Sequence, residues 1–387
     1  MLDFEFSGEQ EQLRDSVARF LDARAPLTWV RDRYDDDRGT TEDVWRELAG
    51  LGVTGLLVPE ACGGAGRGMV DAAVVLEELG RAVHPGPYTS SAIGAASLVR
   101  LAGDDHDHVA FLPGIADGST IATVALYERE RRAEWRAPTT TARAEGDGWR
   151  LDGAKTHVTD LVGADLVIVT ATDPAGALGV FAVAADAPGI DGTPEPTVDG
   201  SRKRGALRLH GAPAHRLGAG DASTAIAETV DRLGVANVME GVGTAARALE
   251  LSVEYAKARQ QFGVPIGSFQ AVQHLCADML RAVELARASS YYACWACDAA
   301  SAGERHRAVT MALAFAADEL FGVGASAIQV HGGIGYTWEH DVHLFYKRLL
   351  TLQEAGGGSV DQLEELAAIV LDASDASDTP GGSGADG

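Results

Sequence analysis

The order of helical and strand-like segments predicts an α+β chain of three domains, with a β domain between two helical ones. Apolar residues recur at helical spacing over residues 1–118. Short runs rich in Val and Thr follow over residues 119–221, and a long helical pattern occupies residues 222–372. Separate blocks of helices and strands, rather than alternating ones, are typical of this class.

The N-terminal region begins with a helix-start signal. Ser7 is followed three residues later by Gln10, the spacing of a capping box, and apolar residues recur at helical spacing from Leu13 onward. Residues 71–81 form a second amphipathic pattern. The glycine-rich run at 63–68 lacks the strand–turn–helix context of a phosphate-binding loop, so we expect a loop between helices there.

The middle region contains four strand-like runs, which read IATVALYE, GWRLDGAKTHVTD, ADLVIVTATD and LGVFAVAAD. Each run is short and bounded by Gly, Asp or Pro, as strands are. No helical pattern separates them. The sequence therefore predicts an antiparallel barrel or sandwich.

The C-terminal region begins with a long helical pattern that carries small residues along one face, which suits close packing in a helical bundle. The pattern breaks at 263–265 and restarts after 267–268, where a helix of about eight turns follows. Residues 373–387 are mostly Gly, Ser and Asp without apolar periodicity, so they predict a disordered acidic tail.

Composition narrows the class of protein. The 387 residues carry a net charge of −24, which disfavours nucleic acid and anionic membrane surfaces as partners. No apolar run approaches the length of a membrane span, and the acidic N-terminus is unlike a secretory signal, so we expect a cytoplasmic protein. Cys294 and Cys297 lie three apart inside a helical pattern, where two small buried residues are favoured over a redox site.

One corner of the C-terminal region brings nucleotide-binding chemistry together. Arg259 is able to fork two phosphate oxygens, Phe262 to cover an adenine face, and the amides of Gln261 and Gln270 to bind polar edges. On chemistry alone, an ordinary charged turn between two helices remains the favoured interpretation.

The motifs around this corner resemble the C-terminal signature of the flavin-dependent acyl-CoA dehydrogenases. The matching segments are RQQFG, PIGSFQAVQH and, further on, QVHGGIGYTWEHDVHLFYKR. The segments DFEFSGEQEQLRDSVARFL and LGVTGLLVPEACGGAGRGMVDAAVVLEELGR resemble the N-terminal part of the same family. Separate motifs in the right order are more specific than a lone glycine loop, and the resemblance covers nearly the whole chain except the tail.

The resemblance implies a complete set of expectations. The fold would end in a four-helix bundle, and the protein would be a dimer of dimers that uses FAD to oxidise an acyl-CoA substrate in lipid metabolism. An electron-accepting flavoprotein would be its redox partner. The adenine end of the flavin would be held by the neighbouring subunit, through Arg259, Phe262, Gln270, Gln329, Gly332 and Gly333. His331, between these motif residues, is interpreted as a surface turn residue.

The flavin-ring pocket departs from the family pattern. Tyr127 stands where the family has a small hydroxyl residue, and the Gly-Ser-Asp turn that should follow is absent. Thr159 is retained, but His157 occupies the position of an aromatic residue. These differences place this chain's own contacts to the flavin ring in doubt.

The catalytic base is also displaced. The family removes a proton with a carboxylate, yet counting from the second motif places Gly356 at one expected position and Leu233 at the other. Glu354 lies two residues before the first. Glu240 lies two turns after the second, where a carboxylate satisfied at a helix–helix contact is the favoured interpretation.

These observations leave three functions open. The leading interpretation is a supporting subunit of a heteromeric acyl-CoA dehydrogenase, which holds the flavin of a homologous sister chain that supplies the base. The alternatives are a self-sufficient homotetramer with Glu354 or Glu240 as base, and a flavin-free scaffold. The basic run 202–204 is either a CoA contact or, as favoured, a surface turn. His340 and His343 lack further patterned ligands, so no metal site is expected.

Overall fold

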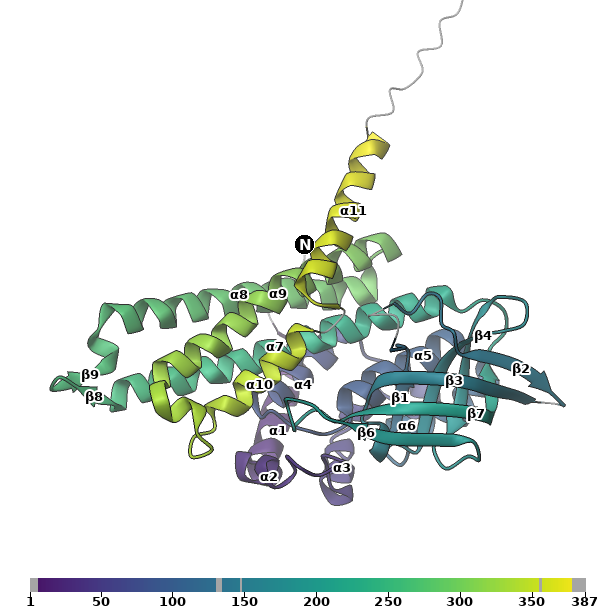
Figure 1. Ribbon diagram of the computed structural model, residues 1–387, viewed down its shortest axis with the longest axis horizontal. Coiled ribbons are helices and arrows are strands. Elements are labelled where there is room, and N and C mark those ends of the chain that lie inside the picture. The colour runs from purple at the N-terminus through teal and green to yellow at the C-terminus, as the bar shows by residue number, and fades with distance from the viewer. Residues whose placement is uncertain (1–5, 130–133, 147, 355–356, 378–387) are drawn as a thin grey trace, which may run out of the picture.

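Two helical domains flank a β domain in the computed structural model (Figure 1). The structure describes residues 6–129, 134–146, 148–354 and 357–377. The long helices of the C-terminal domain extend away from the β domain, and the N-terminal helices pack beneath the region where the two meet (Figure 1). The predicted fold class is confirmed.

The N-terminal domain is helical, as predicted. Its helices are α1 (Gly8–Arg24), α2 (Leu27–Asp32), α3 (Glu42–Ala49), α4 (Met69–Arg81), the π-helical turn η3 (Thr89–Ala95), α5 (Ala96–Ala102) and α6 (Asp105–Ala116). The predicted capping box starts α1. The amide of Gln10 donates to Ser7 Oγ at 3.2 Å, and the amide of Ser7 donates to Gln10 Oε1 at 3.0 Å. This pair satisfies two amides that a helix start leaves without partners.

The β domain is a closed sheet. Its strands are β1 (Ala122–Ala125), β2 (Thr141–Glu145), β3 (Gly148–Thr159), β4 (Leu166–Thr172), β5 (Leu178–Ala184), β6 (Ile190–Glu195) and β7 (Arg204–Leu217). The path β1-β4-β2-β3-β7-β5 returns on itself because β4 also pairs with β5, while β6 lies beside β7.

Two features of the sheet differ from the expectation. The pairing of β1 with β4 is parallel, as is the single β2–β4 contact, although the other pairings are antiparallel. In addition, β2, β6 and β7 were not predicted from the sequence. Charged, Gly and Pro residues interrupt their apolar pattern, because much of each strand faces solvent.

The C-terminal domain is a bundle of long helices: α7 (Ser223–Ala258), α8 (Gln270–Ala299), α9 (Ala302–His331), α10 (Val342–Gln353) and α11 (Ser359–Ser377). Small residues allow α7 to approach α4 closely. A methyl group at Gly80 would lie 2.0 Å from the carbonyl oxygen of Glu240, and one at Gly243 would lie 1.9 Å from that of Glu77. Larger residues at these positions would force the helices apart.

Two expectations about the C-terminal part need correction. Helix α11 continues to Ser377, so the predicted tail begins inside a helix, where Ala373 and Ala376 are the strong helix formers. Residues 378–387 lie outside the described residues. The segment Ala302–Tyr336 is also apolar and long enough to cross a bilayer by length and composition. It packs against α7 and α8 within the bundle, and half of its most apolar window is buried, as in a core helix of the bundle.

The Cys294–Cys297 pair lies inside α8, as predicted, and both residues are buried. Burial raises the pKa of Cys297 to about 12 and that of Cys294 well above its usual value, so neither forms the reactive thiolate. We expect iodoacetamide to label the half-buried Cys276 first in the native protein, as measured by peptide mass spectrometry. Rapid labelling of Cys294 would contradict this placement.

Candidate functional site

A cavity of about 560 Å³ lies where the three domains meet. Its volume is within the roughly 300–1,000 Å³ range of small-molecule sites. Strands β1 and β3 form one wall, α7 and the end of α10 form another, and the π-helical turn η3 closes a third side. The lining residues are Thr89, Ser90, Val124, Leu126, Tyr127, Glu128, Arg129, Thr156, His157, Thr159, Arg202, Arg204, Leu233, Asn237, Thr351, Leu352, Glu354 and Gly357.

The β-domain wall rests on a buried ion pair. Lys155 Nζ lies 3.1 Å from Glu128 Oε1, and Thr139 and Thr140 donate hydrogen bonds to the same carboxylate. Burial opposes the negative charge, but the hydrogen bonds from Thr139 and the Lys155 charge outweigh it, which lowers the pKa of Glu128 to about 2. This fixed pair positions the strand ends that carry Tyr127 and Thr159.

The residues that depart from the family pattern all line this cavity. Burial raises the pKa of Tyr127 to about 12, so its ring brings a bulky neutral phenol where a small hydroxyl residue was expected. His157 has a positive φ of 54°, and its amide donates to Glu195 Oε2 at 2.9 Å. Thr159, the retained residue, lies two positions further along β3.

The structure describes one of the two positions at which the family's catalytic base was expected. Leu233 on α7 lines the cavity with an apolar side chain. Gly356 falls outside the described residues. Glu354 follows the last turn of α10 and also lines the cavity, so it is the carboxylate nearest to the expected position that the described residues bring there.

Glu240 lies outside the cavity lining and belongs to a buried ionic cluster. Its Oε1 accepts a hydrogen bond from Thr89, and its Oε2 contacts the guanidinium groups of Arg202 and Arg348. Arg348 is fully buried and also pairs with Asp199 at 2.8 Å. Both oxygens of Glu240 are therefore engaged, which supports the helix-contact role that its position already suggested.

The basic run 202–204 was interpreted as a surface turn, and the position of Arg202 corrects this. The run is not a surface turn at this residue, because Arg202 is buried against Glu240. Lys203 donates at 2.9 Å to the carbonyl oxygens of both Arg33 and Tyr34. Arg204 lines the cavity. Alternation along a strand start sends neighbouring side chains in opposite directions, which a run of three basic letters does not reveal.

A second buried carboxyl lies close to the cluster. Asp160 accepts a hydrogen bond from Ser90 Oγ at 2.6 Å. Burial raises its pKa to about 6, although that hydrogen bond and the Arg202 charge act in the opposite direction. Since an unfolded Asp titrates near pH 3.9, the folded state binds this proton more tightly between about pH 4 and pH 6. The stabilisation is therefore present at low pH and lost as the pH rises through about 6.

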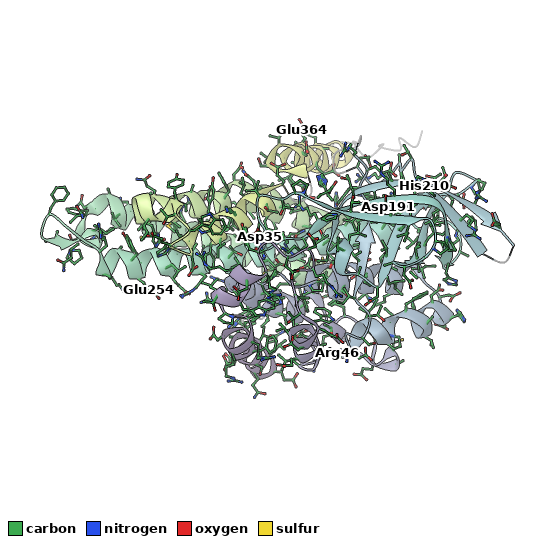
Figure 2. The ribbon with its side chains drawn as sticks, turned by 60° about the horizontal axis from the view of Figure 1, so that its bottom comes forward. Asp35, Arg46, Asp191, His210, Glu254 and Glu364 are labelled. Atoms are coloured by element: carbon green, nitrogen blue, oxygen red, sulfur yellow. The ribbon has the colours of Figure 1, made fainter. Side chains whose placement is uncertain are left out.

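We expect Asp160→Asn to stabilise the protein above pH 6 by up to about 3 kcal/mol, because the amide keeps the Ser90 contact without a buried charge. The gain should shrink toward pH 4. Chemical unfolding of both proteins across this range measures it. Asp191→Asn, at an exposed position on β6 (Figure 2), is the matched control and should show no such trend. A gain that does not change with pH would contradict the assignment.

The predicted adenine-binding residues lie at the far end of α7, away from the cavity. Arg259 caps α7, Gln261 and Phe262 lie in or beside the β8–β9 hairpin (Gln260–Gln261 and Val264–Pro265), and Gln270 starts α8. Figure 1 shows this hairpin at the tip of the bundle, opposite the β domain. Phe262 is 92% exposed.

The second motif comes to the same end of the bundle. The ring of Tyr255, one turn before Arg259, stacks on His331 with centroids 4.6 Å apart. Gln329, Gly332 and Gly333 are exposed around this contact, so the structure brings together the two motifs that the sequence separates. His331 itself is buried, and its Nδ1 lies 2.8 Å from the carbonyl oxygen of Ala327, so its interpretation as a surface turn residue was wrong.

The histidines of the second motif serve packing. His343 lies edge-on to Trp338 at 4.6 Å, and burial together with the nearby Lys347 charge lowers its pKa to about 4. His340 packs against His331 at 4.4 Å. These ring contacts place both histidines in the packing at this end of the bundle.

Comparison with known proteins agrees with this architecture. Family models for the acyl-CoA dehydrogenase N-terminal and C-terminal domains match residues 7–119 and 224–371. The chain is 33% identical over 341 residues to acyl-CoA dehydrogenase IpdE2 of Mycobacterium tuberculosis, a match that covers 88% of this chain and 90% of the relative.

Two solved structures are similar along nearly their whole length. A Tcur3481-Tcur3483 steroid ACAD variant superposes with a TM-score of 0.86 and 33% identity, covering 95% of this chain and 99% of that one. The ChsE4-ChsE5 complex from Mycobacterium tuberculosis gives a TM-score of 0.87 and 27% identity, covering 98% and 100%. The chain is thus a member of the acyl-CoA dehydrogenase family, the flavoprotein oxidoreductases that use FAD to oxidise acyl-CoA thioesters.

Proposed function

We propose that this chain is the flavin-supporting subunit of a heteromeric acyl-CoA dehydrogenase. The observation that carries the heteromeric part of the proposal is the apolar Leu233 at an expected base position in the cavity. The separation of the two predicted flavin-binding regions supports the sharing of a flavin between chains. From Asn237, beside the cavity, to Arg259 there are 22 helical residues of α7, which at 1.5 Å per residue span about 33 Å. One flavin dinucleotide is too short to join them, so the exposed end of α7 is arranged to hold the cofactor of a neighbouring chain.

The residues at this end fit the adenine half of FAD. The guanidinium of Arg259 suits a pyrophosphate, and the exposed ring of Phe262 offers an apolar face. Phe262 is 92% exposed and lies beside the partly exposed Phe269 and Val264, and such a group of apolar side chains indicates a surface that another molecule covers. When bound, FAD supplies the acceptor for the hydride, while these side chains only bind and orient it.

The chain's own cavity is less suited to the reaction. Leu233 stands at one expected base position, and Tyr127 fills space beside the retained Thr159. A homologous sister chain that supplies a carboxylate would complete the site. The two similar structures named after paired chains, Tcur3481-Tcur3483 and ChsE4-ChsE5, support such an arrangement. An electron-accepting flavoprotein is the expected redox partner.

The number of FAD molecules per chain tests this proposal. The chain should be purified alone and after co-expression with a homologous subunit, and its flavin and protein quantified. About one FAD per two chains, with the second polypeptide present, is expected. About one FAD per chain in a protein of this chain alone would contradict the proposal, and a colourless preparation from both expressions would favour a flavin-free scaffold.

A second candidate function rests on Glu354. Because this carboxylate lines the cavity, a self-sufficient homotetramer with Glu354 as base is the alternative that the geometry favours next. Glu240 is less suited to this role, since both of its oxygens are already engaged by Thr89 and two guanidinium groups.

A further inference from the structure

Arg204 is a cation at the cavity wall without a partner among the residues that the structure describes. It is the first residue of β7, where it pairs with Thr159 on β3 and with Glu195 on β6 through the backbone. Its side chain is half-buried and lines the cavity. No hydrogen bond, ion pair or ring contact reaches its guanidinium from any other described residue.

The surroundings of Arg204 disfavour an unpaired charge when the cavity is empty. Burial, together with the charge of neighbouring Arg202, lowers the pKa of Arg204, although the charges of Asp199, Glu195 and Glu354 act in the opposite direction. A guanidinium removed from water without a hydrogen-bonding partner costs free energy. The contrast with Arg202 is direct, because that residue is paired with Glu240.

The neutral part of the lining, apart from the charged Glu128, Arg129, Arg202 and Glu354, indicates what an anionic partner would carry with it. Val124, Leu126, Leu233 and Leu352 give the cavity an apolar side, while Thr89, Ser90 and Asn237 add neutral polar groups. An anion joined to a short carbon chain suits this mixture, because the chain covers the apolar side and the charge reaches the guanidinium. A planar carboxylate also matches the two-pronged donor geometry of Arg.

We propose that this cavity binds a carboxylate-bearing acyl group, such as that of a dicarboxylic acid mono-CoA thioester, with Arg204 as the counter-ion of the distal carboxylate. The inference rests on the proposed function only in taking a CoA thioester as the ligand. It applies whether the thioester is oxidised in this cavity or only held there. Arg204 would then determine which acyl groups the cavity accepts, while other groups perform the chemistry.

A pair of thioesters of equal chain length tests the proposal. Glutaryl-CoA and pentanoyl-CoA differ in the terminal carboxylate, and isothermal calorimetry on the purified FAD-containing protein, with its partner chain where one co-purifies, measures both affinities. We expect glutaryl-CoA to bind about tenfold to a hundredfold more tightly, the effect of a charge-assisted hydrogen-bonded pair. Arg204→Gln should abolish the preference, and Arg204→Lys should retain part of it.

The matched control is Arg208→Gln, which removes the same side chain from an exposed position on the same strand and outside the cavity lining. It should leave the preference intact. Equal affinities in the unsubstituted protein would overturn the proposal, as would a preference that survives Arg204→Gln. An equal loss for both thioesters in that variant would instead assign Arg204 to the CoA phosphates, and a loss of bound FAD would assign it to the flavin. Binding of neither thioester would also overturn this proposal, whereas the proposed function is tested separately by the number of FAD molecules per chain.

Discussion

The isolated chain is expected to oxidise saturated acyl-CoAs about 10²- to 10⁴-fold more slowly than its complex with a homologous partner, because general-base catalysis contributes roughly that factor. The physical reason is the composition of the cavity. Leu233 cannot accept a proton, and Glu240 is held by Arg202 and Arg348. Bleaching of the flavin absorbance by a panel of CoA thioesters measures the rate with and without the partner.

Glu354→Gln provides the control for this prediction. If a partner supplies the base, the substitution should leave the activity of the complex nearly unchanged. Robust bleaching by the single chain that disappears in Glu354→Gln would identify Glu354 as the base and favour the self-sufficient homotetramer. The flavin content of each preparation should be measured alongside, so that loss of cofactor is separated from loss of chemistry.

Arg259→Ala is expected to weaken FAD retention about 30- to 150-fold, since a lost charge-assisted contact to a phosphate costs roughly 2–3 kcal/mol. The side chain is exposed at the end of α7, so the fold should not depend on it. Equilibrium dialysis against FAD, or the absorbance ratio of purified protein, gives the result.

The matched control is Arg46→Ala, which removes another exposed arginine, on α3 far from the hairpin (Figure 2). It should retain FAD fully. Full flavin occupancy in Arg259→Ala would show that the β8–β9 corner does not hold the cofactor. A loss of melting temperature in that variant would indicate that the residue also supports the fold.

The proposed inter-chain flavin site explains two features of the surface together. The exposed Phe262 packs edge-on against Phe269, with ring centroids 6.1 Å apart. The Tyr255–His331 stack then joins the second motif to the same end of the bundle. These contacts arrange the exposed corner before a neighbouring chain brings its cofactor there, and such preorganisation lowers the entropy cost of binding.

The sequence by itself determined the local structure and the family. The capping box at Ser7, the helix break before Gln270 and the strands with regular Val and Thr patterns were predictable, because each depends on residues a few positions apart. The family motifs likewise predicted that Arg259 and Gln329 belong to one binding set, and the structure brings the two motifs to the same end of the bundle. Strand β7 was missed because its solvent-facing residues interrupt the apolar pattern.

Only the tertiary structure decided the roles of the charged residues around the cavity. Glu240 and Arg348 lie 108 positions apart and Arg348 and Asp199 lie 149 apart, yet all three meet in one buried cluster. Adjacent residues in the run 202–204 have three different environments: a buried ion pair, a contact to backbone carbonyls, and a place in the cavity wall without a partner among the described residues. Which charged side chains pair depends on which distant segments of the chain pack together. The local spacing of residues in the sequence carries no information about such contacts.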